Sequence, residues 1–319
     1  MKKKYVLASG LATTAIATAV TGYLVTNRIM YIKKKDDEFI YEREQQANRF
    51  DEVWYESCPK ELLTITSPNG YAVKGVFLKP LETTNTVIIC HGVTENKINS
   101  MKYARMFEHL GFNAIVYDHR RHGESEGKTT SYGHYEKLDL QAMVQAVREK
   151  IGEDALLGIH GESMGAATTI LYAGTLENRA NFYVSDCAFS NFPELLQIIF
   201  KDSLPVSPKY SISFANLFLK LRDGYSLSEV DPLKAVTNIE QPVLFIHSEP
   251  DTFIPADMSR KLYEAKLGDK MLKLFEKGEH AKSFNESPLE YEQAVAKFLH
   301  DYVPQYHNEN TRPLTETIE

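Results

Sequence analysis

This sequence of 319 residues contains little cysteine and tryptophan and has no excess of basic residues. It has three cysteines and one tryptophan, and its formal net charge is -7. Because an odd count excludes a fully paired set of intramolecular disulfides and no C-x-x-C pair occurs, we expect free thiols at Cys58, Cys90 and Cys187. The acidic balance, together with the lack of any stretch that interleaves basic and aromatic residues, argues against nucleic acid as a partner.

Sequence motifs for cofactors and metals are also missing. No G-x-G-x-x-G follows a strand-like run, so no dinucleotide cofactor is implied. His119 and His122, with Asp118 and Glu124 nearby, resemble a metal cluster only in composition, because the segment has no H-E-x-x-H or comparable ligand framework. We therefore expect neither a cofactor nor a metal.

Charged residues are absent from Tyr5 to Val25, a run of twenty-one residues that is long enough to cross a bilayer as a helix. Lysines precede it, and Arg28 and Lys33 to Lys35 follow it. We interpret residues 1–35 as an uncleaved single-pass anchor in the cell membrane. The alternative is a signal peptide cut near residues 17–19, where small residues occur.

The orientation of this anchor is poorly determined, because basic residues on the two flanks nearly balance. A very short N-terminal tail with three lysines favours an extracytoplasmic domain. The free cysteines favour the opposite side.

Apolar runs alternate with helical patterns along residues 61–304. A hairpin is predicted around Pro68-Asn69-Gly70. The strand-like runs that follow it are 86–90, 113–117, 156–159, 182–184, 242–246 and 271–275, and the helical patterns are 101–110, 135–151, 164–173, 256–265 and 288–302. Such alternation predicts an α/β domain with a mostly parallel sheet and helices on both faces.

Two segments flank this domain. Residues 36–60 are charged and punctuated by apolar side chains, which indicates an amphipathic helix or linker, with a solvated stalk as the alternative. Residues 305–319 are polar, and we expect this tail to be disordered.

The pattern G-x-S-x-G occurs twice. Gly161 to Gly165 follows an apolar strand-like run and precedes a helix rich in small residues, which is the context of a strained strand-to-helix turn that exposes a nucleophilic serine. The second copy, Gly123 to Gly127, has neither a buried strand before it nor an apolar helix after it. We interpret Ser163 as a nucleophile and the second copy as a loop.

A serine nucleophile needs a base, a carboxylate that orients the base, and donors for an oxyanion. His280 lies in a glycine-containing loop after the last predicted strand and is the expected base. Asp251 lies in the loop after the run 242–246 and is the expected acid, with Glu249 as its rival. We favour Asp251 because prolines on both sides fix its loop.

The oxyanion donors are expected to be the backbone amides of Val93 and Met164. Met164 follows the serine, and Gly92 lets the backbone before Val93 approach a substrate. His91 is interpreted as a structural residue rather than a second base.

With Ser163, Asp251 and His280 in that order, residues 62–302 resemble the α/β-hydrolase superfamily. The segments 88–94, 117–123 and 160–165 and the N-terminal anchor resemble those of the YqkD-type hydrolases of Gram-positive bacteria, which are similar to serine-aminopeptidase-like and feruloyl-esterase-like hydrolases. The D-x-R-G-x-G-x-S segment of these hydrolases appears here as Asp118 to Ser125, with Arg121 where the pattern has glycine.

The resemblance implies an α/β-hydrolase fold with a small helical insertion at about residues 189–230. Its apolar side chains are expected partly to seal the sheet and partly to line an acyl pocket. The expected function is hydrolysis of a small-molecule carboxylic ester or thioester through an acyl-enzyme on Ser163. The alternatives are an aminopeptidase-like amide hydrolase and a non-catalytic, membrane-tethered binding protein.

Overall fold

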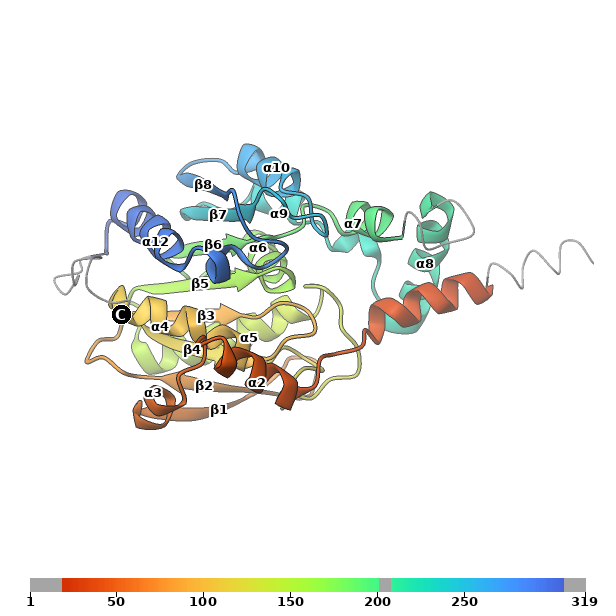
Figure 1. The fold of residues 1–319 in the computed structure, drawn as a ribbon. Coiled ribbons are helices and arrows are strands. Elements are labelled where there is room, and N and C mark those ends of the chain that lie inside the picture. The colour runs from red at the N-terminus through yellow and green to blue at the C-terminus, as the bar shows by residue number, and fades with distance from the viewer. Residues whose placement is uncertain (1–18, 201–207, 307–319) are drawn as a thin grey trace, which may run out of the picture.

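The computed structural model describes residues 19–200 and 208–306, and among these residues eight strands form one sheet (Figure 1). The strands are β1 (Lys60–Thr66), β2 (Ala72–Leu78), β3 (Thr86–Cys90), β4 (Asn113–Tyr117), β5 (Leu157–Glu162), β6 (Phe182–Asp186), β7 (Val243–Ser248) and β8 (Lys270–Phe275). Their order is β1-β2-β4-β3-β5-β6-β7-β8. β2 is antiparallel to β1 and β4, and all other neighbours are parallel, so the predicted mostly parallel sheet is confirmed.

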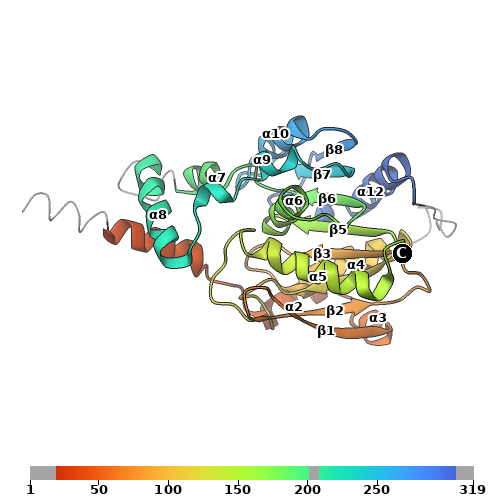
Figure 2. The ribbon, with the colours of Figure 1, turned by 180° about the vertical axis from the view of Figure 1, so that it is seen from behind.

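Helices cover both faces of the sheet, as the two opposite views show (Figures 1 and 2). α4 (Met101–His109) and α12 (Pro288–Tyr302) pack on one face, while α5 (Glu136–Ile151), α6 (Met164–Thr175), α9 (Pro232–Val236) and α10 (Asp257–Ala265) pack on the other. The remaining described elements are α2 (Asp37–Gln46), α3 (Glu52–Ser57), η1 (Lys97–Ser100), α7 (Phe192–Ile199), α8 (Pro208–Asp223), η2 (Leu227–Glu229) and α11 (Ser283–Glu286), together with a helix at residues 19–30.

The central strands are buried on both sides, which explains their continuous apolar runs. In β3, Ile88 and Cys90 face the core under α5 and α6, whereas Val87 and Ile89 face the core under α4 and α12. A strand with a helical layer on each side gains from apolar residues at every position rather than at alternate ones. The two cores hold the sheet rigid, and its carboxyl edge carries the candidate site.

The predicted N-terminal anchor is described only in part. Residues 19–30 are helical and lie beside α8, while residues 1–18, which contain most of the uncharged run, lie outside the described residues. Within the described part of the chain, no helix is long and apolar enough to cross a membrane. The anchor stays a prediction.

Residues 36–60 belong to the folded domain, so the solvated-stalk alternative is wrong. They form α2 and α3, and the side chains of Ile40 and Phe50 are buried. Glu44 on α2 is also buried and forms ion pairs with Arg43 and Arg49, which compensate for the loss of water around its carboxylate. The helical interpretation holds, and the folded domain begins before residue 61.

The folded domain also ends later than predicted. The Tyr306 ring stacks on Phe112 with their centroids 5.8 Å apart, and its hydroxyl donates to the Leu110 carbonyl at 3.1 Å. The start of the expected disordered tail is therefore packed against the domain. Residues 307–319 lie outside the described residues.

Helices α7, α8, η2 and α9 lie between β6 and β7, where a helical insertion was expected. The following apolar side chains of this insertion are buried in the core: Phe189, Phe192, Leu195, Leu196 and Phe200. Leu217 and Leu221 on α8 are instead exposed to solvent. This exposed pair therefore neither seals the sheet nor lines an acyl pocket, the two roles that were expected for the apolar residues of the insertion.

Candidate active site

Ser163 lies at the sharp turn between β5 and α6. Its backbone has φ 55° and ψ -113°, a conformation that costs a residue other than glycine about 1–3 kcal/mol. Its N–H donates to the Asp186 carbonyl of the neighbouring strand at 2.8 Å. The predicted strand-turn-helix context is confirmed, and the turn places the serine at the carboxyl edge of the sheet.

Both glycines of this motif are required by close approach. A Cβ at Gly161 would lie 2.4 Å from the Gly165 carbonyl oxygen, and a Cβ at Gly165 would lie 2.1 Å from the Cys90 carbonyl oxygen. Backbone atoms cannot yield at such distances. The glycines therefore let α6 pack directly against β3 and the end of β5.

Ser163, His280 and Asp251 come together from three different loops at this edge. The Ser163 Oγ lies 2.8 Å from His280 Nε2, and His280 Nδ1 lies 2.7 Å from Asp251 Oδ2. A carboxylate only accepts hydrogen bonds, so Nδ1 carries the proton and Nε2 is left to accept from the serine hydroxyl. This arrangement can take a proton from Ser163 and return it.

The carboxylate of Asp251 is held by four donors. Its Oδ1 accepts from the N–H groups of Phe253 and Ile254, each at 2.9 Å, and its Oδ2 accepts from His280 and from His247 Nε2 at 3.1 Å. Burial opposes ionisation, but hydrogen bonds from His247 and His280 hold the pKa of Asp251 well below its usual range. The group is therefore charged at neutral pH and stabilises a protonated His280.

His247 was not identified from the sequence. Its Nε2 also lies 2.8 Å from the Ile254 carbonyl oxygen, and its Nδ1 lies 2.7 Å from Ser259 Oγ. Because the carboxylate and the carbonyl both accept, Nε2 carries a proton and donates to Asp251. The available signal was a histidine at the end of an apolar strand, four residues before the expected acid.

The two rivals considered from the sequence have other partners. The Glu249 side chain is 45% exposed and forms an ion pair with Arg260, so it is not the partner of His280. His91 is buried, with Nδ1 2.7 Å from the Gly92 carbonyl oxygen and Nε2 accepting from the His119 N–H at 3.0 Å. Burial lowers the pKa of His91, which agrees with a neutral structural role.

The expected oxyanion donors belong to segments that border Ser163. Met164 is the first residue of α6, where a backbone N–H has no acceptor within the helix and the helix dipole favours negative charge. A Cβ at Gly92 would lie 3.5 Å from Ser163 Cβ, so the loop that carries Val93 lies against the turn. Thr94 fixes this loop, since its N–H donates to His122 Nε2 at 3.2 Å.

Two buried acids lie behind the serine. The Glu162 carboxylate accepts from the Tyr103 hydroxyl at 2.8 Å and pairs with Lys102 at 3.2 Å. Burial, with a further contribution from the charge of Glu162, raises the pKa of Asp186 to about 7. The ion pair fixes the residue that precedes Ser163, and no sequence pattern had indicated it.

The second G-x-S-x-G copy is a loop, as predicted. Its Ser125 hydroxyl donates to the Asp118 carbonyl at 2.6 Å and accepts from the Lys74 N–H at 2.8 Å. These two hydrogen bonds of Ser125 join the loop to β2. In the same loop, Arg121 stands where the D-x-R-G pattern has glycine. Its φ of 64° keeps the left-handed conformation that a glycine would favour.

Comparison with known proteins agrees with this architecture. Residues 85–224 match the family described as the alpha/beta hydrolase fold. Over 298 residues, 93% of this chain and 97% of the relative, the sequence is 45% identical to YqkD of Bacillus subtilis (strain 168). The chain belongs to the α/β-hydrolase superfamily.

More distant members of the superfamily are also similar. The lysophosphatidylserine lipase ABHD12 of Danio rerio is 26% identical over 204 residues, which cover 61% of this chain and 50% of that one. The structure of the Pyrococcus furiosus esterase Pf2001 superposes with a TM-score of 0.64 at 24% identity, over 77% of this chain and 94% of that chain. At this level of identity, the structural likeness shows the shared fold.

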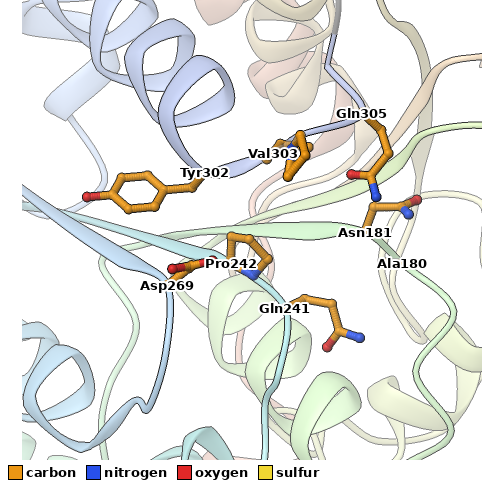
Figure 3. A pocket seen from close by; sticks show the side chains of 9 residues that line it. Ala180, Asn181, Gln241, Pro242, Asp269, Tyr302, Val303 and Gln305 are labelled. Atoms are coloured by element: carbon orange, nitrogen blue, oxygen red, sulfur yellow. The ribbon is translucent and has the colours of Figure 1, made fainter.

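A hollow of about 310 Å³ lies away from the candidate active site of this α/β-hydrolase (Figure 3). Its lining includes Asn181, Gln241 and Asp269, which directly precede β6, β7 and β8 or lie within two residues of them. The hollow is therefore at the amino edge of the parallel strands, opposite Ser163.

In the part of the chain that the structure describes, no group of three or more His, Cys, Asp and Glu side chains is arranged to hold a metal ion.

Proposed function

We propose that this α/β-hydrolase cleaves carboxylic esters or thioesters through an acyl-enzyme on Ser163. The observation that carries the proposal is the hydrogen-bonded series from Ser163 Oγ through His280 to Asp251, with distances of 2.8 and 2.7 Å. Nucleophile, base and orienting acid each have the partner that acyl transfer requires. The strained backbone of Ser163 supports the same role, because strain concentrates at functional residues.

In the first half of the reaction, Ser163 Oγ attacks the carbonyl carbon while His280 Nε2 takes the hydroxyl proton. The N–H groups of Val93 and Met164 stabilise the oxyanion, a role in which one donor contributes about 10²–10³-fold. The bond to the leaving group then breaks, and His280 returns the proton to the departing oxygen or sulfur. In the second half, His280 takes a proton from water, whose oxygen attacks the acyl carbon. The bond from that carbon to Ser163 Oγ then breaks, His280 returns the proton to Ser163, and the acid is released.

An ester substrate with an uncharged acyl chain is supported by the apolar composition of the insertion that follows β6 and by similar proteins. These proteins include a lysophosphatidylserine lipase and a structurally similar esterase. Each buried methylene contributes about 0.8 kcal/mol, so catalytic efficiency should rise with acyl length until the pocket is filled. Short to medium acyl esters should be preferred over charged acyl groups and peptides.

A series of p-nitrophenyl esters, compared with aminoacyl nitroanilides on full-length protein, tests this function. The proposal predicts higher kcat/KM on the esters and no turnover by Ser163→Ala. Higher efficiency on the nitroanilides would favour the aminopeptidase-like alternative. Turnover of neither series, with folded protein, would favour the non-catalytic binding protein.

The location of the hydrolase is a separate proposal. Residues 5–25 anchor it as a single-pass protein in the cell membrane, because the run is uncharged and flanked by basic residues. The domain is on the extracytoplasmic side, because a very short N-terminal tail with three lysines stays inside. Carbonate extraction of membranes should leave the full-length protein in the pellet. Release into the supernatant, or a mature N-terminus near Val20, would contradict the anchor.

A further inference from the structure

The helix at residues 19–30 is packed against the helical insertion through an apolar contact. Val25, Ile29 and Met30 are buried in the same core as Ile212 and Leu219 of α8. The contact is close, because a Cβ at Gly22 would meet the ring of Phe218 at 2.4 Å. The chain that leads towards the predicted anchor is thus part of the same body as α8.

Polar contacts fix the same pair of helices. Arg222 of α8 donates to the Tyr23 carbonyl at 3.2 Å and to the Thr26 hydroxyl, and its guanidinium lies 4.4 Å from the centre of the Tyr23 ring. Both views place the two helices side by side at one end of the molecule (Figures 1 and 2). Any surface that comes close to the helix at residues 19–30 therefore also comes close to α8.

Large apolar side chains of both helices are exposed to solvent. Val20 and Leu24 are 51% and 55% exposed on the first helix, and Leu217 and Leu221 are 56% and 75% exposed on α8. Each pair has a spacing of four residues, so each forms a stripe on its helix. With Tyr23, these residues are called the outer face. A water-facing helix normally carries polar side chains at such positions.

Basic residues border the outer face, although the whole chain is acidic. α8 carries Lys220 and Arg222 near its end, with Asp223 as its last residue. Residues 19–35 contain Arg28, Lys33 and Lys34, together with Lys35, which pairs with Glu95 of the domain. They contain no acidic residue. Acidic residues begin again only at Asp36. Exposed leucines together with basic neighbours match an anionic lipid surface, which takes apolar groups below its headgroups and attracts cations at them.

We propose that the outer face lies in the interface of an anionic lipid bilayer, so that the hydrolase takes acyl-ester lipids from that membrane. Two further features select a bilayer as the occupant. Residues 5–18, which precede the helix at residues 19–30 in the sequence, contain no charged side chain, and the basic border complements anionic headgroups. The substrate class rests on the proposed ester hydrolysis, whereas the surface itself does not.

The insertion connects this surface to the reacting groups. It directly follows β6, which ends at Asp186, the residue whose carbonyl accepts from the Ser163 N–H. A lipid ester that leaves the bilayer beside α8 would therefore meet the insertion that follows this strand. The outer face serves binding and delivery and takes no part in the chemistry.

Fluorescence quenching on full-length protein in vesicles tests the surface. The protein's own three cysteines are buried, so Leu217→Cys can be labelled selectively with a fluorophore, and Leu62→Cys on the edge strand β1, 79% exposed, is the matched control. In phosphatidylcholine vesicles with phosphatidylglycerol, brominated acyl chains should quench the label at 217 and aqueous iodide should not. The label at 62 should be quenched by aqueous iodide and not by brominated acyl chains.

Three results would overturn the proposed surface. The first is quenching by iodide at 217 to the same extent as at 62. The second is protection from iodide without quenching by brominated lipid, which would indicate a second copy of the chain on the outer face. The third is lipid quenching at 217 that does not decrease when phosphatidylglycerol is omitted.

Hydrolysis tests the substrate class separately. Leu217→Glu combined with Leu221→Glu should lower turnover of a diacyl lipid in the same vesicles by about tenfold, because charged residues resist insertion. Hydrolysis of soluble p-nitrophenyl butyrate should stay unchanged. An equal loss on both substrates would overturn delivery from the membrane. Absence of soluble hydrolysis in the wild type would refute the proposed function, while the quenching result still decides the surface.

Discussion

Ser163 and Ser125 stand at the centre of the same five-residue pattern, but their surroundings differ in every respect that matters for reactivity. Ser163 has a strained backbone, and its hydroxyl meets His280 at 2.8 Å. Ser125 lies in a loop, and its hydroxyl is used by two backbone groups. The pattern therefore supplies only small residues around a serine, and the strand, the helix and the partner histidine supply the chemistry.

The residues before the two serines differ as well. Glu162 is buried and pairs with Lys102, with Asp186 beside it, whereas the Glu124 side chain is 72% exposed and pairs with Lys97. A buried ion pair fixes the backbone that it belongs to, because breaking it leaves an uncompensated charge. An exposed pair contributes little. The Ser163 turn is therefore fixed by the buried ion pair of Glu162 and Lys102, whereas the Ser125 loop has no comparable support from Glu124.

The largest expected effect separates the two serines by activity. Ser163→Ala and His280→Ala should each lower kcat on a p-nitrophenyl ester by on the order of 10⁴-fold or more, because the three groups act as one unit. Asp251→Asn should cost somewhat less. Circular dichroism controls for folding, and a folded Ser163→Ala variant with wild-type turnover would refute the assignment.

A smaller effect is expected from the support of Asp251. His247→Leu removes one of its donors and should lower kcat about tenfold, which corresponds to about 1.4 kcal/mol of transition-state stabilisation. His247→Gln keeps an N–H donor and should lose less. Steady-state kinetics on one ester measure both variants, and an unchanged kcat in folded His247→Leu would mean that His247 does not position the acid.

The buried acid behind Ser163 should appear in the pH dependence of stability. With a folded pKa of about 7, Asp186 binds its proton more tightly in the folded protein than in the unfolded chain, where the pKa is about 3.9. Stability from this group is therefore lost as pH rises from about 4 to about 7. The melting temperature of Asp186→Asn minus that of the wild type should therefore increase as pH is raised from about 4 to about 7. A difference that does not change with pH would contradict the raised pKa of this buried acid.

The smallest effect on activity is expected at the second motif copy. Ser125→Ala should keep more than about half of the activity but lower the free energy of unfolding by about 1–3 kcal/mol, because the partly buried Lys74 N–H and the buried Asp118 carbonyl lose their partner. Urea denaturation measures the second effect. A large loss of activity here, with activity intact in Ser163→Ala, would reverse the roles of the two copies.

Much of the fold followed from the sequence because its central strands are buried on both sides. Runs such as Thr86 to Cys90 then stand out as continuous apolar segments, and the predicted bounds of that strand match β3. The serine turn was recognisable for the same reason, since a buried strand and a small-residue helix flank it.

The remainder depended on tertiary contacts that leave little local trace. Ile40 and Phe50 lie in a charged segment, and only their burial and the ion pair of Arg43 with Glu95 show that this segment folds onto the domain. His247 is a single histidine whose role depends on its hydrogen bond to the Asp251 carboxylate in the following loop. The exposed leucines of α8 follow an apolar pattern that from sequence alone indicates burial.

The most direct test of the account is the site at which a fluorophosphonate attaches. The probe phosphonylates a serine whose hydroxyl is activated by a neighbouring base, and peptide mass spectrometry locates the adduct. The account predicts an adduct on Ser163 alone, lost in Ser163→Ala and kept in Ser125→Ala. An adduct on Ser125, or no adduct on the folded wild-type protein, would contradict it.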